Sequence, residues 1–158
     1  MKQIACCFLL LIAVSVLAYA ETRTYMDKRV LSIDINGKVT KEEPGCINQF
    51  TIIGDKIYQK TIAWKEANGM KKGEVWESST PFNIIGRGRN IPFDPSVIDK
   101  LTGAGRIKQQ SVIIAARIQD NLLARCQTDL IIGDDYYFEY RPILGFSGVS
   151  IFTGNRIK

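Results

Sequence analysis

The residues of this sequence that could do chemistry are two cysteines, an aspartate pair and a glycine–arginine repeat. Cys46 and Cys126 are the cysteines outside the first twenty residues. A cysteine nucleophile normally needs a histidine to form its thiolate, and the chain has no histidine. The same absence excludes Ser-His triads, histidine-based zinc sites and histidine-based phosphoryl transfer. An enzyme without histidine would have to use carboxylates or lysine, and no motif in the sequence brings two such groups together. We therefore expect no catalytic residues, no metal site, no cofactor and no enzyme activity.

The aspartate pair has the pattern of a turn. Asp134 and Asp135 follow Gly133 and precede an aromatic run, which is typical of a hairpin between two strands. The pair lacks the alternating Asp-x-Asp-x spacing of a calcium loop. It is therefore not a candidate site.

The repeat Gly86-Arg87-Gly88-Arg89 is the best candidate for recognising a ligand. Its backbone N–H groups and two guanidinium groups could hold a phosphate, sulfate or carboxylate. The alternative is a solvated connecting loop with ordinary surface arginines. The repeat lacks the third glycine of a dinucleotide fingerprint and the Gly-Lys-Ser/Thr of a P-loop, so a nucleotide site is unsupported. With nearby aromatic residues, the predicted ligand-binding set is Tyr58, Trp64, Trp76, Arg87 and Arg89.

The first twenty residues have the pattern of a secretory signal peptide. Lys2 precedes an apolar run from Ile4 to Leu17, and Ala18-Tyr19-Ala20 supplies a small-x-small cleavage site before Glu21. An uncleaved anchor is the alternative, but a spanning helix needs roughly 20 apolar residues. We expect cleavage of residues 1–20, one β-rich domain over 21–158, a secreted or periplasmic location, and no membrane span after cleavage.

Export changes how Cys46 and Cys126 are interpreted. Disulfides form and persist in oxidising compartments, so a Cys46–Cys126 bridge is predicted. It would close a long loop and remove unfolded-state entropy worth about 4 kcal/mol. Two buried thiols without a bridge are the alternative.

The elements that must position these residues are mostly strands, because apolar and polar residues alternate between turn signals. Asn36-Gly37 is a strong hairpin signal, and Gly54-Asp55 predicts a second hairpin. The strand Lys56–Trp64 returns from that hairpin with two distinct faces. One face carries Tyr58, Lys60, Ile62 and Trp64, and the other carries Ile57, Gln59, Thr61 and Ala63.

Two segments of the second half depart from the simple alternating pattern. Residues 106–126 fit either two strands or one helix, and the β-branched run Val112-Ile113-Ile114 favours strands. A short helix is predicted from Asp94 as its cap to Gly103 at its end, with Pro95 in the first turn. The predicted fold is mainly β, a single antiparallel β-barrel or β-sandwich of about 7–9 strands with one short mid-chain helix.

The charge distribution limits the possible partners. The formal net charge is +5, and basic and acidic residues are spread along the chain. Nucleic-acid binding would need a basic stripe with interleaved aromatics, which is missing. The pattern favours binding of a small ligand or an envelope component in or at the mouth of the β domain. The alternative is a secreted structural or interaction protein, an adaptor or inhibitor that uses a sheet edge or a loop. Nothing in the sequence predicts the oligomeric state.

Overall fold

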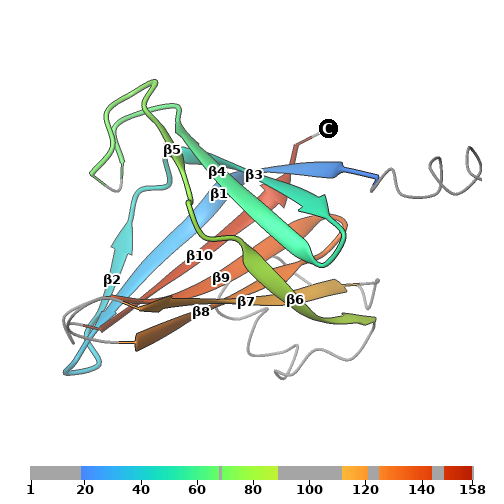
Figure 1. Ribbon diagram of the computed structural model, residues 1–158. Helices are drawn as coiled ribbons and strands as arrows, with labels where there is room; N and C mark the ends of the chain where they lie inside the picture. The colour runs from blue at the N-terminus through green and yellow to red at the C-terminus, as the bar shows by residue number, and fades with distance from the viewer. Residues whose placement is uncertain (1–18, 68, 89–111, 121–124, 144–147, 158) are drawn as a thin grey trace, which may run out of the picture.

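The computed structural model describes residues 19–67, 69–88, 112–120, 125–143 and 148–157. Within these ranges the secondary structure is antiparallel strand, with no helix (Figure 1). The strands are β1 (Glu21–Asp34), β2 (Val39–Glu42), β3 (Cys46–Ile53), β4 (Lys56–Ala63), β5 (Val75–Glu77), β6 (Phe82–Gly88), β7 (Val112–Asp120), β8 (Arg125–Ile132), β9 (Tyr136–Ile143) and β10 (Gly148–Arg156). In the same ranges no helix has the length and apolarity to cross a membrane.

Eight of these strands close into a barrel. The hydrogen-bonded order is β1-β3-β4-β6-β7-β8-β9-β10, and β10 pairs again with β1 from Tyr25–Arg156 to Asp34–Gly148. The remaining two strands extend the wall, β2 beside the second half of β1 and β5 beside the end of β4. The predicted mainly β fold is confirmed, and of the two predicted architectures the structure is the barrel.

The predicted hairpins are formed at local turn signals. Gly37 has a φ of 78° and Gly54 a φ of 61°, both in the left-handed region that glycine tolerates. The Asp34 carboxylate accepts hydrogen bonds from the backbone N–H groups of Asn36 and Lys38 at 2.8 and 2.9 Å. This side chain satisfies the donors of the β1–β2 turn.

Alternate residues of each strand face the barrel interior, and one half of the interior is filled by apolar side chains. The rings of Tyr25, Phe50 and Tyr137 lie with centroids 5.3–5.9 Å apart. Phe82, Leu130 and other residues of the same cluster surround these rings. The outward side of β1 and β7–β10 is also apolar and buried, with Leu31, Ile131, Phe138 and Ile151 among its residues. Strands β7–β9 are therefore buried on both faces, which explains their nearly continuous apolar sequence.

A β-bulge in β1 changes which residues point inward. The β1–β10 register shifts between Asp27 and Arg29. Before the shift the odd-numbered residues Tyr25 and Asp27 are buried, and after it Val30 takes the inward position opposite Phe152. Bulges commonly re-aim side chains in this way.

The barrel wall has one narrow seam. Strands β4 and β6 pair at Lys56–Asn83 and Ile57–Phe82, whereas further along β4 pairs with β5 from Lys60 to Ile62. The link between β5 and β6 therefore crosses beside an interrupted stretch of wall. The Arg117 guanidinium reaches this link and donates to Ser78 Oγ at 2.6 Å and to the Thr80 carbonyl at 3.5 Å.

Two sequence predictions concern β7 and β8. Residues 112–120 and 125–126 are strand, so the strand interpretation of this region is confirmed there and the helix alternative is wrong. The predicted helix from Asp94 to Gly103 lies outside the described residues.

The predicted disulfide is not formed in the structure, where Cys46 and Cys126 are not bonded to each other. The topology gives the reason. Cys46 is on β3 and Cys126 on β8, four strands apart in either direction around the ring. With neighbouring strands about 4.8 Å apart, an eight-strand ring is on the order of 12 Å across. A disulfide requires Cα atoms within about 7 Å.

The pairing of β1 with β10 depends on Gly154. A Cβ atom there would lie 2.4 Å from the Met26 carbonyl oxygen and 2.5 Å from Tyr137 Cε1. We expect Gly154→Ala to lower the free energy of unfolding by about 1–3 kcal/mol, because neither the backbone nor the buried ring can move away easily. Urea unfolding measures this change. The control is Gly86→Ala, whose Cβ would meet nothing closer than Ile114 at 3.9 Å. Equal stabilities of the two variants would contradict the role of Gly154.

Candidate functional site

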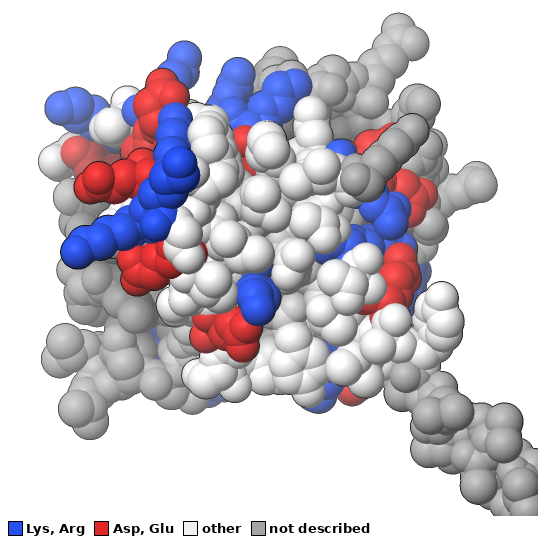
Figure 2. Space-filling model, turned by 90° about the horizontal axis from the view of Figure 1, so that it is seen from above, with Lys and Arg blue, Asp and Glu red and all other residues white. Residues whose placement is uncertain are grey.

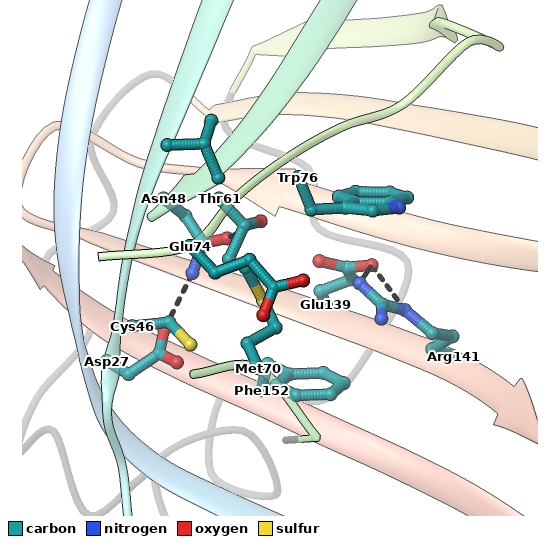
Figure 3. Close-up of a pocket in the computed structure, with 11 residues that line it drawn as sticks. Asp27, Cys46, Asn48, Thr61, Met70, Glu74, Trp76, Glu139, Arg141 and Phe152 are labelled. Carbon is teal, nitrogen blue, oxygen red and sulfur yellow. Dashed lines mark hydrogen bonds and ion pairs between the residues drawn. The ribbon is translucent and has the colours of Figure 1, made fainter. Parts of the chain in front are cut away.

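The half of the barrel interior that is not filled by apolar side chains contains a cavity of about 230 Å³. Its walls come from β1, β3, β4, β5, β9, β10 and the segment between β4 and β5 (Figure 3). The lining residues are Asp27, Cys46, Asn48, Thr61, Met70, Glu74, Val75, Trp76, Glu139, Arg141 and Phe152. In Figure 3 Asp27 and Cys46 lie on one side, and Trp76, Glu139 and Arg141 on the other.

Backbone hydrogen bonds hold the segment between β4 and β5 over this cavity. Ala67 and Met70 exchange backbone hydrogen bonds at 2.9 and 3.1 Å, and the Gly73 N–H donates to the Ala63 carbonyl at 2.7 Å. Gly69 and Gly73, with φ of 75° and 85°, make the turns. The segment thereby places Met70 and Glu74 at the cavity.

A layer of buried polar side chains forms the base of the cavity around Asn48. The Asn48 amide donates to Asp27 Oδ1 at 2.7 Å and to the Tyr137 hydroxyl at 3.0 Å. Thr61 Oγ1 donates to Asn48 Oδ1 at 2.7 Å, and the Tyr137 hydroxyl donates to Asp27 Oδ1. These bonds orient Asp27, because its neighbours are fixed on three other strands.

The second part of this layer is a buried carboxylate between two guanidinium groups. Glu139 Oε1 accepts from Arg141 Nε at 3.0 Å and from an Arg141 terminal nitrogen at 2.7 Å, while Gln59 donates to Glu139 Oε2 at 3.0 Å. Arg117 lies 3.9 Å from the same carboxylate. The side chains of Arg117 and Glu139 are each 1% exposed. The Arg141 pKa is raised, chiefly by the charge of Glu139.

Aromatic rings support the two guanidinium groups. Arg117 lies 4.2 Å from the Phe82 ring centroid and 6.0 Å from that of Trp76, and Arg141 lies 4.7 Å from that of Phe152. Cation–π contacts of this kind strengthen where water is excluded. The Arg117–Phe82 contact is the buried one, since Trp76 is 39% exposed and the Arg141 side chain 35% exposed.

Asp27 is the least compensated group of the site. It is 5% exposed, and its Oδ2 atom has no hydrogen-bond partner within the described part of the chain. Burial raises the pKa of Asp27 to about 6, although its hydrogen bond from Tyr137 favours the ionised form. Gln59 Oε1 is a second buried acceptor that lacks a partner there. Gln59 does not line the cavity, so the cavity wall contains one unused acceptor, which belongs to a carboxyl group whose pKa is about 6.

The predicted ligand-binding residues are dispersed. Trp76 lines the cavity. Tyr58 and Trp64 are exposed on the outside of the wall, where the Lys65 ammonium lies 5.1 Å from the Trp64 ring centroid. Arg87 is exposed and donates to the Gly54 carbonyl at 3.1 Å, so it lies at the opposite end of β3 from Cys46. Arg89 lies outside the described residues.

Sequence reasoning missed Asp27, Asn48, Glu139 and Arg141. The available signal was polar residues at positions whose alternate neighbours are apolar, such as Gln59 and Thr61 on the inward face of β4. For Asp27 the β1 bulge hides this signal. Odd-numbered residues point inward before the bulge and even-numbered residues after it, so the pattern of polar and apolar residues is not continuous along β1.

No family model, curated protein or solved structure matches the chain. The described residues also include no group of three or more Cys, Asp or Glu side chains placed to hold a metal ion. The chemistry of the site is therefore derived from its own geometry.

The raised pKa of Asp27 predicts a specific pH dependence of stability. The folded state binds this proton more tightly than the unfolded state, whose Asp pKa is near 3.8. The stabilisation of the folded state by protonated Asp27 is therefore fully present below about pH 4 and is lost as pH rises through about 6. Ionising Asp27 in the folded state thus costs on the order of 3 kcal/mol of the free energy of unfolding. Asp27→Asn removes this cost because it carries no charge.

We expect the stability of Asp27→Asn relative to the unmodified protein to rise between pH 4 and 7 in urea unfolding. The control is Asp55→Asn, which changes a carboxylate whose side chain is 80% exposed. A stability difference for Asp27→Asn that stays constant across this pH range would show that the carboxyl group titrates normally.

Proposed function

We propose that the protein is exported and that its barrel binds a small ligand in the cavity lined by Asp27 and Trp76. The observation that carries the proposal is Asp27 Oδ2, a buried acceptor without a partner among the described residues, in the wall of a cavity of about 230 Å³. Binding sites are typically concave, with apolar walls and a few convergent polar groups. The signal-peptide pattern of residues 1–20 supports export, and β1 begins at Glu21, directly after the predicted cleavage site.

The cost of the polar layer supports a role in binding over a role in stability. Barrels of eight strands can be filled by side chains alone, as the half around Tyr25, Phe50 and Leu130 is filled. The other half carries the buried groups of Asp27, Glu139 and Arg117 and the half-buried Arg141 instead, and buried charges usually stabilise less than apolar residues of the same volume. Local costs of this kind are typical of functional sites.

The outer wall favours a second candidate function, binding of a protein partner. Tyr58, Trp64 and Ile53 are exposed large apolar residues of β3, β4 and the segment after β4. Figure 2 views this side of the barrel and shows a broad uncharged area at its centre. Exposed apolar areas of this kind often mark interaction sites. The alternative proposal is therefore an adaptor or inhibitor that uses this wall.

The two tryptophans allow the two functions to be tested separately. Trp64→Phe leaves Trp76 at the cavity as the sole tryptophan, and Trp76→Phe leaves Trp64 on the outer wall. We expect at least one member of a screen of fatty acids, small aromatics and anionic sugars to change the Trp76 emission with a saturable dependence on concentration. The same ligand should leave the Trp64 emission unchanged.

Silence of Trp76 across this screen would contradict the ligand-binding proposal. A response of Trp64 alone would move the site to the outer wall and favour the protein-binding alternative.

A further inference from the structure

We propose that the ligand of this cavity is a small organic cation, an amine joined to a flat apolar body such as an arylalkylamine. This inference rests on the proposed function and specifies its ligand class. It follows from the charges, the unused acceptor, the aromatic wall and the size of the cavity.

The charges of the cavity are unequal. Its lining holds the carboxyl groups of Asp27, Glu74 and Glu139 and a single guanidinium group, that of Arg141. Arg141 and the nearby Arg117 are engaged with Glu139. Asp27 forms no ion pair among the described residues, although the charge of Arg141 acts on it. Glu74 is exposed and accepts a hydrogen bond from the Lys71 N–H at 2.8 Å, and Figure 3 shows its carboxylate over the cavity between Asp27 and Arg141. A cation compensates these two groups, whereas an anion adds to the unfavourable charge.

The hydrogen-bonding capacity of the site points to the same class. Asp27 Oδ2 is an acceptor in the cavity wall that lacks a partner in the described ranges, whereas Gln59 and Arg117, which also carry an unpartnered atom there, do not line the cavity. The Glu139 carboxylate is already engaged by Arg141 and Gln59. An ammonium group carries only donors, so one of its N–H groups can satisfy Asp27 Oδ2 while its charge pairs with the carboxylate.

The remaining wall accepts a flat apolar body of limited size. Trp76, Phe152, Met70 and Val75 line the cavity and contribute apolar surface, and Figure 3 shows Trp76 on the side away from Asp27. A volume of about 230 Å³ corresponds to on the order of eight water molecules at about 30 Å³ each. A single aromatic ring with a short amine chain fits within this volume, and a long-chain fatty acid does not.

Binding of such a cation is coupled to ionisation of Asp27. The charged and titratable groups around Asp27 are Tyr137, Glu139 and Arg141 on β9, Cys46 on β3 and Glu74 before β5. Burial raises the pKa of Asp27 to about 6, so the ion pair is lost as pH falls through this value. At pH 5 the apparent affinity should be about tenfold weaker than at pH 7.5, because one unit below the pKa about a tenth of Asp27 is ionised.

The test compares three compounds of one shape and different charge by isothermal titration calorimetry at pH 7.5. They are 2-phenylethylamine, 2-phenylethanol and phenylacetate. We expect the amine to bind at least tenfold more tightly than the alcohol, and phenylacetate to bind most weakly. The amine should lose about tenfold in affinity at pH 5 while the alcohol does not, since a primary amine stays protonated at both pH values.

Two variants test whether Asp27 is the group that recognises the amine. Asp27→Asn should weaken amine binding at least tenfold and remove its dependence on pH, with circular dichroism to confirm folding. The matched control is Glu77→Gln, a carboxylate on the outer wall paired with Lys60 at 2.9 Å, which should bind the amine as the unmodified protein does.

Tighter binding of phenylacetate or the alcohol, no binding of the amine, or unchanged amine binding by Asp27→Asn would overturn this ligand class. If the amine does not bind but another compound changes the Trp76 emission, the proposal of ligand binding in the cavity is retained and only the amine class is rejected. The pH comparison on the unmodified protein tests the inference even if Asp27→Asn does not fold.

Discussion

Pairing of the first strand with the last is the interaction on which the rest of the structure depends. β1 is fourteen residues long and hydrogen-bonds to β3 and β2 along one edge and to β10 along the other. Without the β1–β10 ladder the ring would be an open sheet with two exposed edges. With it, alternate residues of eight strands face an interior in which each polar group needs a protein partner or a ligand.

Closure divides that interior into two chemically different halves. Around Tyr25, Phe50 and Tyr137 the side chains are apolar and interlocked. Tyr137 links the halves, since its ring packs in the apolar cluster and its hydroxyl bonds to Asp27 in the polar layer. Its pKa is raised well above 10, first by burial and then by the negative charge of Asp27. It thus remains a neutral hydrogen-bond donor to that carboxylate. The apolar half supplies rigidity, and the polar layer presents to the cavity one acceptor, Asp27 Oδ2, that the described chain does not use.

The sequence allowed prediction of what depends on nearby residues. The turns at Asn36-Gly37 and Gly54-Asp55 and the two faces of β4 follow from local pattern and are confirmed. Trp76 lies at the cavity because its strand pairs with β4 at Thr61. The local sequence did not show that Trp76 lines the cavity while Trp64 lies on the outer wall. The buried ion pairs and the position of Cys46 opposite Cys126 depend on ring order, which is set by contacts between the two ends of the chain. Alternation of polar and apolar residues does not predict the order of strands around the ring. The bulge after Asp27 also interrupts this alternation next to the site.

The short pairing between β4 and β6 has a dynamic consequence. Opening a closed wall at a long ladder breaks many hydrogen bonds at once, but here the ladder covers two residues on each strand. Local opening of a protein begins where the fewest contacts must be lost, so amide hydrogens of Ile57 and Phe82 should exchange with solvent sooner than those of the β1–β10 ladder. Arg117 is the side chain that limits this opening, because it is anchored inside the barrel and bonds to the link at Ser78. The Arg117 guanidinium group, which pairs with Glu139, therefore also holds the segment between β5 and β6 against the barrel beside Trp76.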